Sequence, residues 1–459
     1  MREKMAIVEN VNINPELVKN VDQDLQPTKK RIMGSVSYAA SFMGGCVSIG
    51  TFSMGAGLIG ELTVLQAVIA MTIGCLVIAV ALAIIGECGH TYGIPFTVQL
   101  RSSFGFTGVK IPGVLRGLPA IVWFGYQSWV GAGAINSCAS ILFGFDNLPV
   151  VYGLFTLVQV LLAIKGFEGI KWMENISCIF ILVILAYMLY VVNTEFSTEI
   201  GDVFSGIEGT WGMPFWAATT SFLGIYSTMI INASDYSRNA TDDIKPVKAA
   251  SIYTIAILPV TLFMGLIGLL VTAATGNSDP VVVFSTTMDN TFLTIMTLLF
   301  IAFAQVTTNV LNNIVPPAYV LMESFKVKWT YATILVGVLS VVVMPWKLVT
   351  AESAAGLNLF TQFYSAFLGP IFAVMAVDFY ILRKKKLDLN RMYDKNGPYK
   401  GMNWAAVIAI VIGSICSLII MELSWYVSLI PTGVIYYFLM KKMKSAEGFR
   451  VGTIFEDEK

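Results

Sequence analysis

The feature that most limits the fold is a series of long apolar stretches that recur along almost the whole chain. A helix needs about 20 apolar residues to cross a hydrocarbon core of ~30 Å. Of the 459 residues, 56% are hydrophobic and 13% are charged, whereas a soluble domain carries roughly a quarter charged residues. We therefore predict an all-α polytopic membrane protein with twelve transmembrane helices, at residues 34–59, 63–86, 114–142, 148–165, 173–193, 211–234, 249–275, 290–322, 329–346, 354–381, 403–421 and 424–440.

The basic residues indicate how such a chain is oriented. Short cytoplasmic loops of membrane proteins hold an excess of Lys and Arg. With both termini inside, Lys347 is the one basic residue in an outer loop. The inner segments hold the others, among them Arg31, Arg101, Arg116, Lys165, Arg238, Lys326 and Arg383. The polar first thirty residues contain no apolar segment typical of a cleaved signal peptide, so we expect a multi-pass protein of the cell membrane with cytoplasmic N- and C-termini.

The third and eighth predicted helices are longer than one crossing requires, and they stand five helices apart. An odd repeat of five would be inverted, and transporters built from inverted repeats bind substrate and ion at broken helices. The first helix is a candidate for such a break at Gly44, Gly45 and Gly50, and the sixth helix at Ser221 and Gly224. The alternative is that these glycines only allow close helix packing.

On this hypothesis the chain divides into segments that follow the predicted helices. The parts are a cytoplasmic N-terminal segment at 1–32, a first repeat at 33–193, a second inverted repeat at 194–382, a cytoplasmic loop at 383–402, helices eleven and twelve at 403–441, and a cytoplasmic tail at 442–459.

Ionisable side chains are absent from the middle of the first, third, sixth, eighth and tenth helices. Such groups usually mark proton relays or the partners of charged substrates. The single histidine, His90, lies in a predicted loop, and the run Arg383–Lys386 is expected at the lipid headgroups. No nucleophile, acid–base pair or metal cluster is visible in the helices, and the net charge of +0 by itself says nothing about partners; no nucleic-acid partner is expected. The chain is therefore not expected to be an enzyme, and its substrate is expected to be neutral.

Two helices carry polar side chains that suit a flat, neutral ligand and a small cation. Trp123 and Gln127 in the third helix are four residues apart and share one helical face. The eighth helix carries five hydroxyl and amide side chains that would be costly against lipid: Thr307, Thr308, Asn309, Asn312 and Asn313. Hydroxyls and freed carbonyls are hard donors that favour sodium over protons. Packing of Trp123 and hydrogen bonding between helices are the alternatives.

Several motifs resemble those of the nucleobase-cation-symport family, the permeases for cytosine, uracil, purines, hydantoins and allantoin. The similarity runs across nearly the whole chain, and its motifs are Gly93–Gly105 (GIPFTVQLRSSFG), Arg116, Trp123–Trp129 (WFGYQSW), Thr308–Asn309, Asn313, Pro317–Tyr319, Gly369–Pro370 and Asp378–Tyr380. The resemblance implies a fold of the leucine-transporter type, a five-plus-five inverted repeat with two further helices.

The resemblance also implies roles for particular residues. Trp123 would stack on the substrate ring, Gln127 and Asn313 would bind its amide edge, and Tyr226 would close the other face. Hydantoin permeases of the family have a larger ring at the position of Tyr226 and a glutamine at that of Cys46, so the identity of the ring stays open. The sodium site would use carbonyls near Phe42, Gly45 and Ala304 and the hydroxyls of Thr307 and Thr308.

We therefore expect a secondary active transporter that imports a neutral nucleobase or related cyclic amide by cation symport, with sodium favoured, through alternating access. Its partners would be a heterocyclic substrate, a cation and the lipid bilayer, with no cofactor and no obligate protein partner. The alternatives are the same fold with another substrate class, such as an amino acid, a proton-coupled or ion-independent permease, and a channel or receptor.

Overall fold

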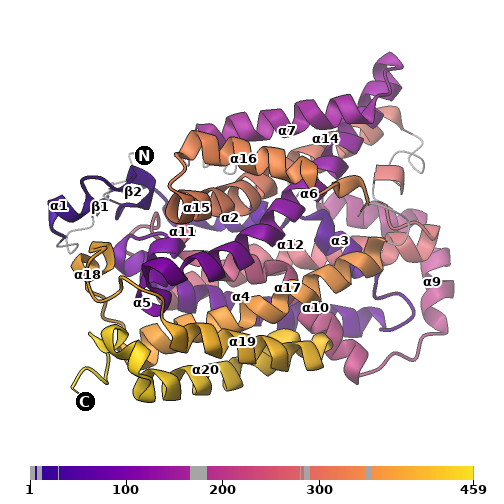
Figure 1. Cartoon of the computed structure of the whole chain (residues 1–459). Helices are drawn as coiled ribbons and strands as arrows, with labels where there is room; N and C mark the ends of the chain where they lie inside the picture. The colour runs from indigo at the N-terminus through magenta and orange to yellow at the C-terminus, as the bar shows by residue number, and fades with distance from the viewer. Residues whose placement is uncertain are drawn as a thin grey trace.

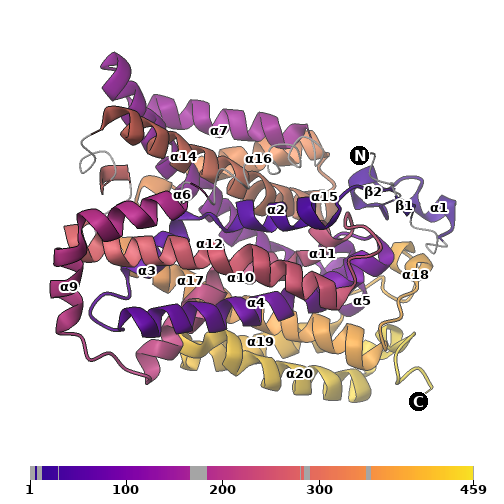
Figure 2. The same cartoon turned by 180° about the vertical axis from the view of Figure 1, so that it is seen from behind.

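The structure, a computed structural model, describes residues 6–7, 13–28, 30–165, 183, 185–279, 281–283, 290–347 and 353–457. These residues form a bundle of long helices that lie side by side (Figure 1), with a short antiparallel pair of strands, β1 (Ala6–Ile7) and β2 (Lys30–Arg31), at one end. Both chain termini lie at that same end, which we call the terminal end. The helix α9 (Ser197–Ser205) lies at the opposite end (Figure 2).

The elements follow the predicted spans closely. The first part of the chain forms α1 (Pro15–Val18), α2 (Ser35–Cys46), α3 (Ile49–Ala56), α4 (Val64–Tyr92), α5 (Phe96–Gly108), α6 (Lys110–Phe143) and α7 (Leu148–Ile164). The second part forms α10 (Met213–Ile231), α11 (Ala233–Ser237), α12 (Pro246–Thr275), α14 (Thr291–Asn309), η2 (Val310–Ile314), α15 (Val315–Phe325), α16 (Trp329–Val342), α17 (Ser353–Ala376) and η4 (Val377–Leu382). The last part forms α18 (Leu389–Tyr393), α19 (Trp404–Ile419) and α20 (Ser424–Lys442).

Helices occupy the predicted spans, and in the fifth, 173–193, the described residues 183 and 185–193 are helical while the others lie outside the described residues. Within the described part of the chain, five helices are long and apolar enough to cross a membrane, namely Val64–Tyr92, Pro246–Thr275, Thr291–Phe325, Leu359–Leu382 and Met421–Lys442. Shorter apolar helices are Leu148–Ile164, Trp329–Val342 and Trp404–Ile419. The total of twelve crossings stays a prediction.

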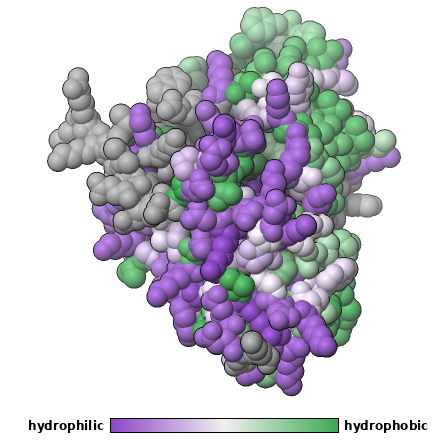
Figure 3. Space-filling view, turned by 60° about the vertical axis from the view of Figure 1, so that its left-hand side comes forward, coloured by the Kyte–Doolittle hydropathy of each residue, from purple (hydrophilic) through white to green (hydrophobic). Residues whose placement is uncertain are grey.

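The outer surface of the bundle is apolar along its flanks. Large apolar side chains of α7 and α19 point outward, among them Leu154, Leu157, Leu161, Ile415 and Ile419. Figure 3 shows apolar side chains along one flank and polar side chains gathered on the terminal end, which is turned toward the viewer. Since water would disfavour an apolar surface of this extent, these flanks face lipid.

The predicted break in the first helix is confirmed. The helix α2 ends at Cys46, and Val47 leaves the helical conformation with ψ at 77°. A new helix, α3, begins after Ser48, whose side chain accepts a hydrogen bond from Gly50 N at 3.1 Å and so caps it. The break therefore frees backbone carbonyls in the interior of the protein.

The predicted break in the sixth helix at Ser221 and Gly224 is wrong. The helix α10 runs without interruption from Met213 to Ile231 and changes direction only at Asn232. A Cβ on Gly224 would lie 2.8 Å from Ser365 Oγ and 2.9 Å from Thr361 Cγ2 on α17. This glycine therefore serves close helix packing, which was the alternative considered from the sequence.

Buried ion pairs neutralise charges at the terminal end. Arg101 of α5 binds both carboxylate oxygens of Glu323 on α15, at 3.0 and 2.6 Å. Arg383 binds Asp378 at 2.8 Å, and both side chains are 1% exposed. The expectation that Arg383 reaches the lipid headgroups is therefore wrong, because its charge is neutralised inside the protein. The three lysines that follow, 384–386, are exposed as expected.

Candidate functional site

A central pocket brings most of the predicted binding residues together. It is lined by Gly45, Ser48, Trp123, Gln127, Ile225, Tyr226, Thr228, Met229, Thr308, Asn312 and Asn313. These residues come from the break between α2 and α3 and from α6, α10, α14 and η2. Its volume of about 20 Å³ is on the order of one water molecule, so the lining must move apart to admit a ring. None of the described residues that line it carries a charge.

Trp123 is held in place on several sides. Its indole Nε1 donates to Tyr364 Oη at 3.2 Å, and its ring meets Tyr126 edge-on at a centroid distance of 5.7 Å. A Cβ on Gly50 would lie 2.6 Å from Trp123 Cη2 and 2.6 Å from Ile225 Cδ1. The glycine in α3 therefore lets the backbone approach the indole, which is 4% exposed.

The hydroxyl of Tyr226 is tied to the scaffold around the pocket. It bonds with Thr51 Oγ1 at 3.1 Å and Thr261 Oγ1 at 3.0 Å, and it donates to the carbonyl of Cys46 at 3.3 Å. These bonds leave the ring as the part of Tyr226 that a ligand can meet. Cys46 itself contributes its carbonyl to this network, and its side chain is fully buried.

The two predicted amide residues are anchored differently. Gln127 Nε2 donates to Ser48 Oγ at 3.0 Å, and its Oε1 is buried without a hydrogen-bond partner among the described residues. Asn313 Nδ2 donates to Asn309 Oδ1 at 2.8 Å. An unpaired buried acceptor costs free energy unless a ligand satisfies it, so Gln127 Oε1 marks a position for a donor.

Oxygen atoms cluster where α14 meets the end of α2. Thr308 Oγ1 lies 2.9 Å from Gly44 O, 2.9 Å from Val47 O and 3.0 Å from Ala304 O. A hydroxyl has one proton and satisfies one of three carbonyls at a time. The remaining oxygens form a partly negative cluster that fits a small hard cation.

The other predicted cation ligands are placed around this cluster. Thr307 Oγ1 donates to Ala304 O at 2.9 Å. The carbonyl of Gly45 accepts from Asn312 Nδ2 at 3.2 Å, and the Phe42 ring packs on Tyr236 and Tyr253. Of the carbonyls that contact Thr308, that of Ala304 was predicted, whereas those of Gly44 and Val47 lie one and two residues from the predicted Gly45.

Arg116, which the sequence places at the inner end of the third predicted helix, is a buried residue near the pocket. Because α6 begins at Lys110, the guanidinium lies inside the bundle, fully buried. It donates to Asn232 Oδ1 at 2.8 Å and to the carbonyl of Asn312 at 2.9 Å. Its position seven residues before Trp123, on the same helical face, is the signal that could have placed it.

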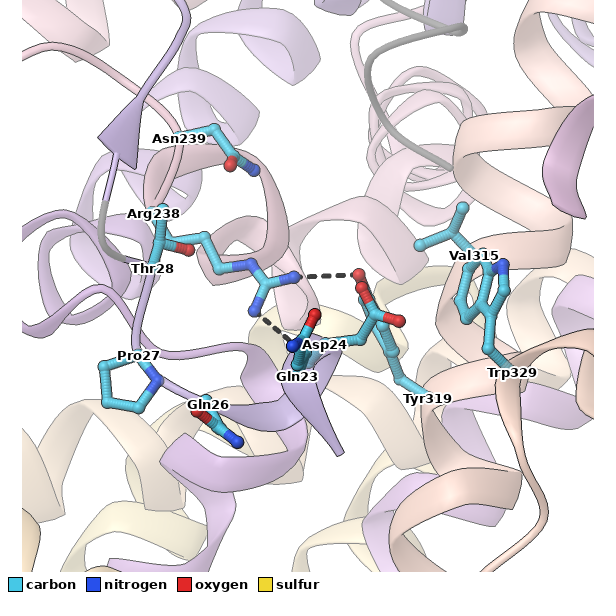
Figure 4. Close-up of a pocket in the computed structure, with 10 residues that line it drawn as sticks. All are labelled: Gln23, Asp24, Gln26, Pro27, Thr28, Arg238, Asn239, Val315, Tyr319 and Trp329. Atoms are coloured by element: carbon cyan, nitrogen blue, oxygen red, sulfur yellow. Dashed lines mark hydrogen bonds between the residues drawn. The ribbon is translucent and has the colours of Figure 1, made fainter. Parts of the chain in front are cut away.

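A larger cavity of about 360 Å³ opens at the terminal end (Figure 4). Arg238 crosses it and donates to Tyr319 Oη at 2.8 Å and to the carbonyl of Asp24 at 2.8 Å. The lining comes from the segment 23–28, the residues after α11, and helices α15 and α16. It shares no residue with the central pocket. One side of it is formed by α15, the helix that follows Asn313 toward the terminal end.

Comparisons with known proteins agree on one family. The profile for permeases for cytosine/purines, uracil, thiamine and allantoin matches residues 26–445. A hydantoin permease of Microbacterium maritypicum is 27% identical over 422 residues, covering 88% of this chain and 85% of the relative. An allantoin permease of Bacillus subtilis is 27% identical over 470 residues, covering 92% and 93%.

A solved structure has the same fold. It is a nucleobase-cation-symport-1 family transporter in a closed conformation with bromovinylhydantoin bound, with a TM-score of 0.84 at 24% identity, covering 94% of this chain and 99% of that one. This similarity confirms the all-helical, leucine-transporter-type fold. Because the profile spans most of the sequence and the relatives are permeases, the chain is a membrane transporter and not an enzyme, and it belongs to the nucleobase-cation-symport family of permeases for cytosine/purines, uracil, thiamine and allantoin.

Proposed function

We propose that this protein is a secondary active transporter that imports a neutral nucleobase or related cyclic amide together with sodium. The observation that carries the proposal is the central pocket, where Trp123, Tyr226, Gln127 and Asn313 lie beside the oxygen cluster around Thr308. The names of the similar hydantoin and allantoin permeases support this class of substrate.

The chemistry of the lining supports a flat, uncharged ring. Trp123 and Tyr226 offer two aromatic faces, each worth about 0.5–1.5 kcal/mol beyond the area that they bury. Gln127 and Asn313 offer amide groups for the edge of the ring. Because no charged side chain lines the pocket, a carboxylate or ammonium group would lack a partner. An amino acid is therefore a weaker candidate.

Sodium is the coupling ion that the oxygen cluster favours. The cluster consists of a hydroxyl and main-chain carbonyls, which are hard neutral donors. The described residues that line the central pocket include no carboxylate and no histidine, so this lining supplies no obvious proton carrier. Sodium bound there would join α2 to α14 and favour the conformation that binds the ring. Coupling requires that both ligands favour the same state.

The terminal end faces the cytoplasm in this proposal. Basic residues are concentrated in segments at this end, including Lys384, Lys385 and Lys386, and cytoplasmic loops are enriched in Lys and Arg. The protein would lie in the cell membrane, and the ring would leave toward the cavity at Arg238 after the bundle opens there.

The test is uptake and binding of a panel of rings by the wild type and by two tryptophan variants. Trp123→Ala is expected to abolish uptake of uracil, hydantoin or allantoin while membrane insertion stays intact. Trp129→Ala is the matched control, because Trp129 lies on the same helix, packs on Tyr152 and Trp346, and does not line the pocket. Normal uptake by Trp123→Ala would refute the site. Absence of binding and uptake of every ring by the wild type would refute the substrate class.

A further inference from the structure

Three amide side chains form a continuous hydrogen-bonded chain that ends at the central pocket. Asn309 Nδ2 donates to Gln159 Oε1 at 2.9 Å, and Asn313 Nδ2 donates to Asn309 Oδ1 at 2.8 Å. Gln159 lies on α7 and Asn309 on α14, and both are fully buried. Asn313 lines the pocket, whereas Gln159 and Asn309 do not.

The direction of this chain is fixed by groups that cannot reverse their roles. Gln159 Nε2 donates to the backbone carbonyl of Phe155 at 3.3 Å and to Ser128 Oγ at 2.9 Å. Asn309 Nδ2 lies 3.4 Å from the backbone carbonyl of Phe124. A carbonyl accepts and never donates. Turning either amide over would therefore bring two oxygens together in a buried site.

The end of the Asn313 carboxamide that is turned away from Asn309 is consequently its oxygen. That oxygen accepts no hydrogen bond within the described part of the chain. Gln127 Oε1, on the other side of the pocket, is likewise without a partner there. Both amides therefore have an unused acceptor.

We propose that Gln159 and Asn309 are positioning residues that fix Asn313 so that its carboxamide oxygen meets the substrate, and that the pocket consequently selects rings by their N–H donors. This inference rests on the proposed function and narrows it to cyclic imides and ureides. Rings of this class carry an N–H between or beside carbonyl groups, and hydantoin, uracil and allantoin are examples. Methylation of that nitrogen removes the donor and leaves Asn313 Oδ1 unsatisfied.

The first experiment needs no variant. Binding of uracil, hydantoin and allantoin to the purified wild type is compared with binding of their singly N-methylated derivatives. An unpaired buried acceptor costs about 1–3 kcal/mol, so methylation at the recognised nitrogen is expected to weaken binding about 5- to 150-fold. Methylation at another ring position serves as the steric control. Equal binding of every methylated derivative and its parent would overturn the inference.

The second experiment tests the positioning role directly. Asn309→Leu removes the partner of Asn313 and lets its amide rotate, and Gln159→Leu removes the anchor one step further away. The ratio of affinities for the N–H ring and its N-methyl derivative is expected to fall toward one in Asn309→Leu, and by a smaller factor in Gln159→Leu. A merely structural role would change both affinities together and leave this ratio unchanged.

Gln305→Leu is the matched control for both variants. Gln305 is also a buried glutamine on α14, but among the described residues its Nε2 bonds only to Ile301 O on its own helix. Its ratio is expected to equal that of the wild type. An unchanged affinity ratio in correctly folded Asn309→Leu would overturn the positioning role. If the variants do not fold, the methylation series still decides whether the pocket recognises an N–H donor of the ring. Failure of the wild type to bind any of the three rings would refute the proposed function and this inference with it.

Discussion

Replacing Thr308 by valine tests the link between the cation and the ring. Valine keeps the shape of threonine and removes the hydroxyl, which lies within 2.9 to 3.0 Å of three carbonyl oxygens. Loss of one ligand and of the hydrogen bond that it makes costs about 1–3 kcal/mol. At 1.4 kcal/mol per factor of ten, the affinity for sodium is expected to fall about 5- to 150-fold.

The assay is a titration of intrinsic tryptophan fluorescence with the ring that binds, in the absence of sodium and at saturating sodium. In Thr308→Val the ring affinity without sodium is expected to stay near that of the wild type, whereas the sodium concentration that gives half of the tightening is expected to rise about 5- to 150-fold, so that little tightening remains at a concentration that just saturates the wild type. Thr308→Ser restores the hydroxyl and should restore the coupling. Thr219→Val is the control, because the hydroxyl of this buried threonine bonds, within the described part of the chain, only to Phe215 O in its own helix. Unchanged activation by sodium in Thr308→Val would refute the cation site.

Three further predictions concern single contacts. Gly50→Ala places a Cβ 2.6 Å from the indole of Trp123, so the affinity of the protein for the substrate ring is expected to fall about tenfold or more in the fluorescence titration. Gly133→Ala, which has open space around it, should leave this affinity unchanged. Glu323→Gln leaves Arg101 buried without its counter-charge, which costs roughly 3–5 kcal/mol. A thermal-unfolding scan should therefore show a lowered melting temperature. Lys385→Ala, which breaks a partly exposed ion pair, should change the melting temperature little. Burial raises the pKa of Asp24 above its ordinary value, although the charge of Arg238 opposes this shift. The segment 13–28 therefore binds a proton more tightly when it is docked than when it is free, and it docks better as the pH falls. Asp24→Asn should increase hydrogen-exchange protection of this segment at neutral pH, and reduced protection would contradict the expected direction of the pH effect.

The course of the helices was predictable because a bilayer imposes a minimum length on every apolar span. What the sequence alone could not decide was whether a glycine breaks a helix or lets a neighbour approach. Gly44 and Gly45 precede a real break at Val47, whereas Gly224 meets α17 in an unbroken helix. The difference depends on the partner helix, which lies far away in the chain.

The same limit applies to the central pocket. Trp123 and Gln127 were found from the sequence because they lie one helical turn apart on a single helix. Gln159 was not, because it stands alone in a helix whose other faces meet lipid, and its partner Asn309 lies 150 residues further along the chain. Arg116 was counted only as a basic residue of an inner segment, because the amide oxygen of Asn232 that accepts its hydrogen bond lies 116 residues further along the chain.

The break between α2 and α3 explains how two ligands could act on one conformational equilibrium. Val47 turns its carbonyl to Thr308, and the next residue, Ser48, accepts from Gln127 through its hydroxyl. One peptide unit thus separates the oxygen cluster from the amide side of the ring pocket. A cation that draws the carbonyl of Val47 toward α14 also fixes the backbone that carries Ser48, and Ser48 in turn orients Gln127. Since coupling is reciprocal, a ring bound to Gln127 should tighten the cation site by the same factor, and Ser48→Ala should weaken the coupling even though both Trp123 and Thr308 are intact.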